Sequence, residues 1–327
     1  MRTKILYVIV SGADDYYMEQ LLVSVYSARH HNPSAHVEIL MDKTTFDSLP
    51  GRGELSRTLE ELSSHITVAD LDPSLSKKRR SRMLKTGMRE YVEGDFLFLD
   101  CDTIVTASLE GIDAIEGSVA ACLDSHCLFK DNPYRRADIQ MCRKIGIDIS
   151  YEKNFFNSGV IFSRDDLKSR EFFQKWSSFY SEGFQKGVTQ DQPAFNKADI
   201  LLGRIIQVLD DVWNCELKHG VRFLRDALVV HYLCSLPDPG REYFVMNDRE
   251  VLQRIKESGR VPEEIAALAD NPFTGIPPLT RLFAGEDLEL FSTLRFRHLR
   301  RIHKKGRRSI ADFILRVYYH FVGYGGL

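Results

Sequence analysis

The stretch "DFLFLDCDTIV", residues 95–105, places four apolar residues directly before Asp100 and Asp102, which flank a single cysteine. A strand has a side-chain period of two, so both carboxylates point the same way if the strand continues, and their repulsion is unfavourable in a low-dielectric site. Two interpretations are open here. The pair is either an acidic turn after a strand or a site for a divalent cation that in turn holds a phosphate.

This stretch lies within the first 250 residues, which alternate short apolar runs with longer periodic segments. Strands are predicted at "KILYVIV", "AHVEIL", "HITVAD", "DFLFL", "SVAACL", "NFFNSGVIF", "RIIQVL" and "DALVVHYL", and helices at about 15–30, 52–63, 81–91 and 164–182. This alternation predicts an α/β fold with a mostly parallel sheet flanked by helices. Ligands of such sheets bind at the carboxyl ends of the strands, and Asp100 and Asp102 follow one of those ends.

Composition limits the class of protein. The 327 residues are 43% hydrophobic and 28% charged, which suffices for a sizeable core. The first apolar run, residues 5–10, is too short for a signal peptide, and no run approaches the roughly 18 residues of a membrane span. The six cysteines lack zinc-site spacing, so we expect free thiols in a reducing cytosol. We expect a catalytic domain over 1–255 and a helical extension over 256–327.

The basic and aromatic C-terminal segment differs from the rest of the chain. Residues 295–327 hold nine Lys/Arg and one acid, which gives this segment a charge of +8 and leaves −10 on the remainder. In "SIADFILRVYYHF", residues 309–321, apolar and aromatic residues recur at helical spacing. This stripe either packs onto the catalytic domain or forms an interfacial helix drawn to an anionic membrane surface. The second interpretation predicts a cytoplasmic protein, peripheral on the inner face of the plasma membrane.

Polar residues also follow other predicted strands. In "SGADDYY", residues 11–17, either Asp14 or Asp15 can cap the next helix, which leaves the other carboxylate, with Tyr16, for a nucleotide base. Asp124 closes "VAACLD", and Asn157 stands among apolar residues and needs a polar partner.

Three further stretches carry candidate residues. In "SRMLKTGMR", residues 81–89, most cations belong to a solvated helix surface, but either Arg82 or Lys85 can reach a substrate phosphate or sugar hydroxyl. In "VTQDQPAFN", Asp191 is a natural helix cap, a role that does not account for Gln192. His231 ends an apolar strand, where histidine is commonly structural. Two carboxylates and an imidazole nevertheless form a site suited to Mn²⁺ and compatible with Mg²⁺.

The order of D-x-D, "FNSGVIF", "QDQPAFN" and "VHYL" resembles the family 8 glycosyltransferases over about residues 4–235. The resemblance implies a GT-A fold and retaining transfer of a hexose from a UDP-sugar to a glycan or lipid-linked acceptor, in surface polysaccharide or lipopolysaccharide synthesis. It implies metal binding by Asp100, Asp102 and His231, and nucleotide binding by Asp14, Tyr16 and Asp102. It also implies that Arg82, Asp124, Asn157, Asp191 and Gln192 hold the donor sugar.

Retention of configuration sets the expected catalytic roles. Gln192 is a poor nucleophile, so we expect front-face attack, with its amide oxygen stabilising an oxocarbenium-like carbon on the reacting face. Asp191 is the only nearby rival nucleophile. Family members often carry a glycine and a lysine after the metal histidine that grip the diphosphate, whereas this chain reads "HYLCSLPDPGREYF". Lys218, Arg222 or Arg241 can substitute for them.

Two other classes of protein remain open from the residues alone. A phosphohydrolase also uses D-x-D to form an aspartyl-phosphate, but it places the motif on its first strand, followed by Gly-Thr. A nucleic-acid-binding protein would use the basic C-terminal segment. The acidic remainder of the chain opposes the second class, so we expect no nucleic-acid partner.

Overall fold

The computed structural model describes residues 1–233 and 245–276, together with residues 293, 313 and 317. The chain forms two compact units, Met1–Pro277 and Pro278–Leu327. The first unit extends beyond the boundary expected at residue 255, because it includes the helices α8 (Arg249–Ser258) and α9 (Glu263–Asp270). The expectations for Arg241 and for the basic segment 295–327 lie outside the described residues, apart from two isolated positions.

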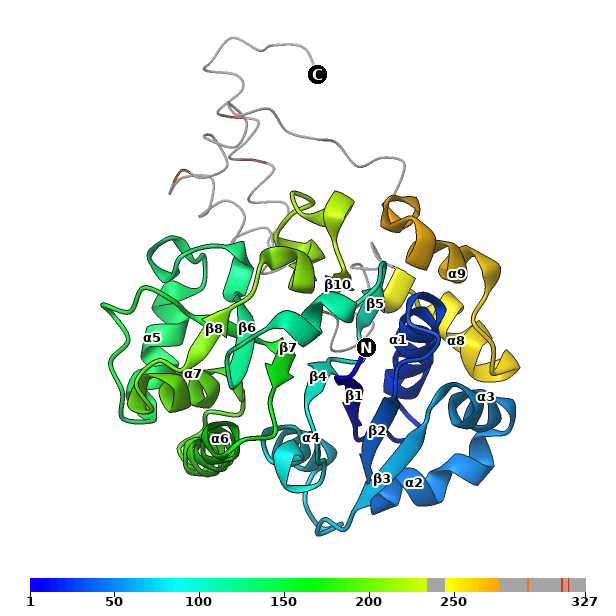
Figure 1. Cartoon of the computed structure of the whole chain (residues 1–327), viewed down its shortest axis with the longest axis horizontal. Coiled ribbons are helices and arrows are strands. Elements are labelled where there is room, and N and C mark those ends of the chain that lie inside the picture. Colours follow the sequence, from blue (N-terminus) through cyan, green and yellow to red (C-terminus); the bar gives the residue numbers. More distant parts are fainter. Residues whose placement is uncertain (234–244, 277–292, 294–312, 314–316, 318–327) are drawn as a thin grey trace. The chain divides into compact units, whose positions relative to one another are not determined.

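The first unit is built on a seven-stranded sheet in the order β3-β2-β1-β4-β7-β6-β8 (Figure 1). Its strands are β1 (Lys4–Ile9), β2 (Val37–Asp42), β3 (His65–Ala69), β4 (Phe96–Leu99), β6 (Val119–Leu123), β7 (Phe156–Ser163) and β8 (Ile206–Val208). Strands β3, β2, β1 and β4 run parallel, as do β6 and β8, whereas β7 is antiparallel to both of its neighbours. The expected mostly parallel sheet is confirmed, and the reversal of β7 was not predicted.

A second, three-stranded sheet has the order β5-β10-β9. It contains β5 (Thr103–Val105), β9 (Cys215–Glu216) and β10 (Val229–His231). In the antiparallel pairing of β5 and β10, His231 lies opposite Thr103. The strand expected at "DALVVHYL" therefore forms in this second sheet, which brings His231 next to the D-x-D turn.

Helices cover both faces of the main sheet, as the alternation along β1 requires. Ile5, Tyr7 and Ile9 join the core beneath α1 (Tyr17–His31), α3 (Glu54–Leu62), α8 and α9. Leu6 faces the opposite core, beneath α4 (Lys77–Thr86), α6 (Leu167–Gln185) and α7 (Gln192–Leu201). Figure 1 shows these two sets of helices on opposite sides of the sheet. Two further helices, α2 (Lys43–Ser48) and α5 (Arg135–Lys144), complete the set of α-helices described in this unit.

Local capping explains where the helix bounds differ from those expected. α4 begins at Lys77 rather than at residue 81, because the hydroxyl of Ser76 accepts a hydrogen bond from the backbone N–H of Arg79 at 3.3 Å. α6 begins at Leu167, because Asp166 accepts from the N–H of Ser169 at 2.8 Å. Within the described part of the chain, no helix combines the length and apolar character that crossing a bilayer requires.

Candidate active site

The site is assembled at one edge of the main sheet. Asp100 follows the end of β4 and Asp124 the end of β6, while the antiparallel β7 begins at the same edge. The backbone N–H of Asp100 donates to the carbonyl of Gly159 at 2.8 Å, and that of Asp124 donates to the carbonyl of Phe155 at 2.8 Å. The reversal of β7 therefore places its first residues between the two aspartates.

Asp100, Asp102 and His231 converge there, with one ligand atom from each within 4.8 Å of the others. His231 Nε2 lies 3.3 Å from Asp102 Oδ1 and 3.9 Å from Asp100 Oδ2. The imidazole lies against Gly159, where an added Cβ would come within 2.2 Å of its Cε1 atom. Only glycine at position 159 leaves room for the ring.

A chain of amides fixes which nitrogen of His231 faces the carboxylates. Asn157 Oδ1 accepts from the N–H of Gly159 at 2.8 Å and from Asn214 Nδ2 at 3.1 Å. Asn214 Oδ1 is therefore the acceptor for His231 Nδ1–H, at 2.9 Å. In the neutral ring, Nε2 then presents a lone pair to Asp102, so two acceptors oppose each other. A cation between them satisfies both, and these nitrogen and oxygen donors suit Mn²⁺ or Mg²⁺.

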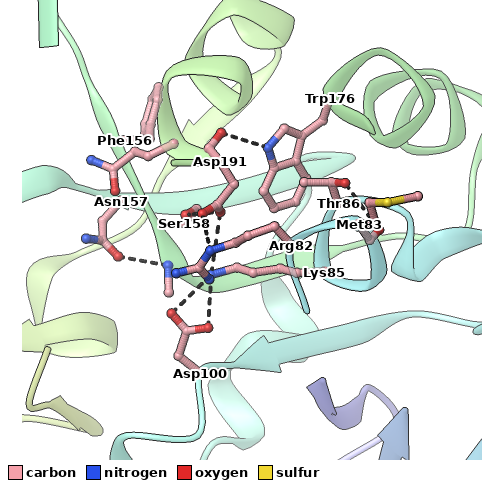
Figure 2. A network of polar contacts seen from close by, with 12 residues as sticks. Arg82, Met83, Lys85, Thr86, Asp100, Phe156, Asn157, Ser158, Trp176 and Asp191 are labelled. Carbon is pink, nitrogen blue, oxygen red and sulfur yellow. Dashed lines mark hydrogen bonds and ion pairs between the residues drawn. The ribbon is translucent and has the colours of Figure 1, made fainter. Parts of the chain in front are cut away.

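Two cations from α4 reach the site, where the sequence analysis expected one. Lys85 Nζ lies 2.9 and 3.1 Å from the two carboxylate oxygens of Asp100 and 3.7 Å from Asp191 Oδ2. Arg82 Nε lies 3.2 Å from Asp191 Oδ1. Figure 2 shows both side chains directed at Asp191, with Asp100 on the other side of Lys85. Lys85 thus links the D-x-D turn to the start of α7.

Asp191 and Asp100 respond differently to this environment. Burial raises the pKa of Asp191, but the Arg82 guanidinium, Lys85 and a hydrogen bond from Ser158 outweigh burial and bring that pKa to about 2. Burial also raises the pKa of Asp100, and the neighbouring Asp102 adds to the rise, so that Lys85 and His231 do not offset it. Asp191 occupies the N-cap position of α7 but makes no capping hydrogen bond, so the expected capping role is wrong. Its carboxylate binds Arg82 and the Ser158 hydroxyl instead.

Asp124 accepts hydrogen bonds from three side-chain amides on the sugar side of the site, the side expected to bind the donor sugar. Its Oδ1 accepts from Gln192 Nε2 at 2.8 Å and from Asn157 Nδ2 at 3.1 Å, and its Oδ2 accepts from Asn132 Nδ2 at 2.8 Å. The amide nitrogen of Gln192 is thereby committed to Asp124. Its amide oxygen is the end of the side chain that remains for a ligand.

The loop after β1 separates the two N-terminal aspartates. Asp15 is buried and accepts from the Ser11 hydroxyl at 2.7 Å and from the N–H of Gly12 at 2.9 Å, and its Oδ2 is 2.5 Å from Lys77 Nζ. Asp15 therefore organises the turn, while Asp14 is exposed. Tyr16 lies against α8, where its hydroxyl donates to Gln253 at 3.1 Å and Lys256 Nζ is 5.3 Å from its ring centre.

Four other residues are placed by the structure: Asn214, Lys218, Arg222 and Cys101. Asn214 orients His231, but the preceding "DVW" carries no pattern that marks it. The candidates Lys218 and Arg222 lie 6.0 Å and 5.1 Å from the ring centres of Tyr134 and Phe223, respectively. Cys101, between the two aspartates, is half-buried. Burial and both flanking aspartates raise the pKa of its thiol, which keeps it protonated and unreactive.

Comparison with known protein families bears on this arrangement. The glycosyl transferase family 8 model matches residues 94–235. These residues are thus similar to a family 8 glycosyl transferase domain. The match covers every metal-site candidate and, among the sugar-side candidates, Asp124, Asn157, Asp191 and Gln192; Asp14, Tyr16 and Arg82 precede it. A comparison with curated proteins gave no match.

Solved structures with a similar fold are also glycosyltransferases. The galactosyltransferase LgtC in complex with donor and acceptor sugar analogs is 19% identical, with a TM-score of 0.51 over 81% of this chain and 99% of that chain. An active-site mutant of LgtC gives 19% identity and a TM-score of 0.51 over 80% and 98% of the two chains. GlyE from Streptococcus pneumoniae TIGR4 is 18% identical, with a TM-score of 0.48 over 86% of this chain and 67% of that chain.

The LgtC likeness identifies the fold as GT-A type, and at this identity it shows the fold alone. The family match indicates the type of reaction. The family match and the fold likeness together support a glycosyltransferase. This favours the glycosyltransferase interpretation over the phosphohydrolase and nucleic-acid-binding ones.

Proposed function

We propose that the chain is a metal-dependent, retaining hexosyltransferase that moves a hexose from a UDP-sugar to a glycan or lipid-linked acceptor of a surface polysaccharide or lipopolysaccharide. The observation that carries the proposal is the opposed set of acceptors formed by Asp100, Asp102 and His231. They lie beside a sugar-sized set of amides and carboxylates around Asp124 and Asp191. The family match supports the transfer reaction itself.

The three metal-side residues would hold Mn²⁺ or Mg²⁺, which as a Lewis acid stabilises the charge of the departing diphosphate. His231 is oriented for this role by Asn214, and Gly159 gives its ring space. Asp102 also lies near Tyr17, whose pKa is raised by burial first and by Asp15 next, and then by Asp102 itself. This places the D-x-D turn close to the loop where Asp14 and Tyr16 would receive the nucleotide.

The sugar-side residues favour front-face attack. A carboxylate with a pKa of about 2 that is bound to Arg82 and Ser158 is a weak nucleophile, so Asp191 serves better to position Arg82 and the sugar hydroxyls. Gln192 donates its amide N–H to Asp124, which leaves its oxygen to stabilise positive charge at the anomeric carbon. The proton of the acceptor hydroxyl then passes to the leaving phosphate.

A panel of UDP-sugars tests this function, with Mn²⁺ present and released UDP as the readout. We expect one or a few sugars to give UDP release that EDTA abolishes and that Mn²⁺ restores. Hydrolysis of a chromogenic phosphate ester, with no UDP release from any sugar nucleotide, would support the phosphohydrolase instead.

We also propose that residues 295–327 bring the enzyme to the cytoplasmic face of the plasma membrane, where a lipid-linked acceptor would lie. The charge of +8 on this segment supports the proposal. Deleting residues 295–327 should abolish binding to anionic vesicles and leave UDP-sugar hydrolysis largely intact. Aggregation of the shortened protein, or failure of the full chain to bind such vesicles at low salt, would show that the segment belongs to the core.

A further inference from the structure

A second group of metal-ligand side chains lies at the other end of α1. His30 and His31 close α1, and Asp270 closes α9, which contacts α1 (Figure 1). His30 Nε2 lies 2.8 Å from Asp270 Oδ1, and His31 Nε2 lies 2.9 Å from the carbonyl oxygen of Ala269. One ligand atom from each of the three side chains lies within 4.8 Å of the other two.

The site is separate from the D-x-D turn. α1 has 15 residues, so at 1.5 Å per residue about 21 Å of helix separates Tyr17, after the β1 loop, from His31. Neither histidine takes part in the network around Asp100 and Asp191. A ligand here can therefore be tested without disturbing the residues proposed for sugar transfer.

The donor set suits zinc. Two imidazole nitrogens and one carboxylate are ligands that Zn²⁺ accepts in four-coordinate sites, with water or a carbonyl such as that of Ala269 as the fourth. Zinc–ligand distances are about 2.0–2.2 Å, so the three side chains must draw slightly closer together. The His30 and Asp270 side chains are 43% and 67% exposed and have room to move.

The electrostatics of the two helices favour a cation at this place. Both α1 and α9 end here, so the negative ends of two helix dipoles converge on the three side chains. The nearby Arg29 guanidinium is engaged elsewhere, donating to the carbonyls of Leu62 and Ala35. The Tyr26 and His30 rings lie nearly parallel, with ring centres 6.3 Å apart.

We propose that His30, His31 and Asp270 form a structural zinc site that fastens α9 to the end of α1. The hydrogen bond between His30 and Asp270 marks where the metal goes: Zn²⁺ replaces the shared proton, which is released to solvent. Because α8 and α9 follow the last strand and pack on α1, the metal would stabilise the C-terminal end of the first unit.

Equilibrium dialysis of the full chain against Zn²⁺ tests the site. Wild type and the control His65→Gln, which alters an exposed histidine outside the group, should each retain one more equivalent of zinc than the double variant His30→Gln/His31→Gln. Asp270→Asn should weaken this binding at least tenfold. Asp102→Asn should leave it unchanged, which separates it from any metal bound at the D-x-D turn.

Thermal unfolding gives a second measurement that does not depend on the double variant folding well. Zinc should raise the Tm of wild type and of His65→Gln by more than it raises that of Asp270→Asn. Equal zinc retention by wild type and the double variant, or an equal rise in Tm for wild type and Asp270→Asn, would overturn the site. The side chains would then form a surface hydrogen bond only.

Discussion

Asp100 and Asp191 contact the same lysine, yet the pKa values of their carboxyl groups are shifted in opposite directions. Arg82, Lys85 and Ser158 compensate Asp191 and bring its pKa to about 2. Asp100 shares Lys85 but also faces Asp102, so burial leaves its pKa raised. The sugar side of the site is thus satisfied by the protein's own cations.

The metal side, in contrast, brings two carboxylates together. Asp100 and Asp102 lie 3.9 and 3.3 Å from His231 Nε2, and Lys85 contacts Asp100. A group that is costly to leave uncompensated becomes favourable once a divalent cation binds. The difference between the two carboxylates therefore indicates which half of the site needs an added ligand and which half is ready-made.

The largest expected effect tests the metal half. Asp100→Ala, Asp102→Ala and His231→Ala should each lower Mn²⁺-dependent turnover of the UDP-sugar by at least roughly 100-fold, because each removes a ligand of a Lewis-acid metal. Steady-state kinetics at saturating Mn²⁺ measures this. Asp47→Ala, at an exposed aspartate of α2 that pairs with Lys43, is the control and should match wild type. Near-normal turnover in all three variants would refute the metal assignment.

The next effect tests the sugar half. Gln192→Ala should lower kcat by more than about tenfold with little change in the affinity for UDP, because its amide oxygen acts at the reacting carbon. Turnover assays and UDP titration by calorimetry separate the two quantities. Equal losses in both would make Gln192 a binding residue.

The sequence was sufficient to predict the parallel part of the fold and most of the candidate residues. The continuous apolar runs in "KILYVIV" and "DFLFL" predict buried strands, and the position of Asp100 after the second predicts the edge where ligands gather. The reversal of β7 could not be predicted in this way, because a fully buried antiparallel strand shows the same continuous apolar pattern as a parallel one.

The electrostatic pairing within the site was also beyond the sequence. Arg82 and Lys85 lie three residues apart on α4 and so share a face, but which carboxylate each one meets depends on where α7 begins in space. In the same way, "DDYY" leaves two aspartates equivalent until the contacts of Asp15 with Ser11 and Lys77 distinguish them. Spacing indicated the candidates, and tertiary packing assigned their partners.

Replacing the shared lysine sharpens the comparison. Lys85→Met should tighten Mn²⁺ binding in the absence of nucleotide by about tenfold, because it removes a positive charge beside Asp100. Titration of Mn²⁺ by electron paramagnetic resonance measures the free ion directly. Lys78→Met is a matched control on the same helix, since Lys78 contacts Thr189 and not the carboxylates. Weaker Mn²⁺ binding by Lys85→Met would mean that Lys85 mainly orients Asp100 for the metal.

The smallest effect concerns a third carboxylate, which forms no ion pair with any cation in the described part of the chain. Asp138 on α5 is buried, and its pKa is raised to about 7, by burial first and by Asp124 second. Between about pH 4 and pH 7 the unfolded chain loses this proton while the folded chain keeps it, so this group lowers stability as pH rises through that window.

Asp138→Asn mimics the protonated acid and removes this loss of stability. It should raise the free energy of unfolding at pH 8 relative to wild type by at least about 1 kcal/mol, and by less at pH 5. Urea unfolding at the two pH values measures the difference. An equal change at both would show that the carboxylate of Asp138 is already stabilised in the folded protein, as that of Asp191 is.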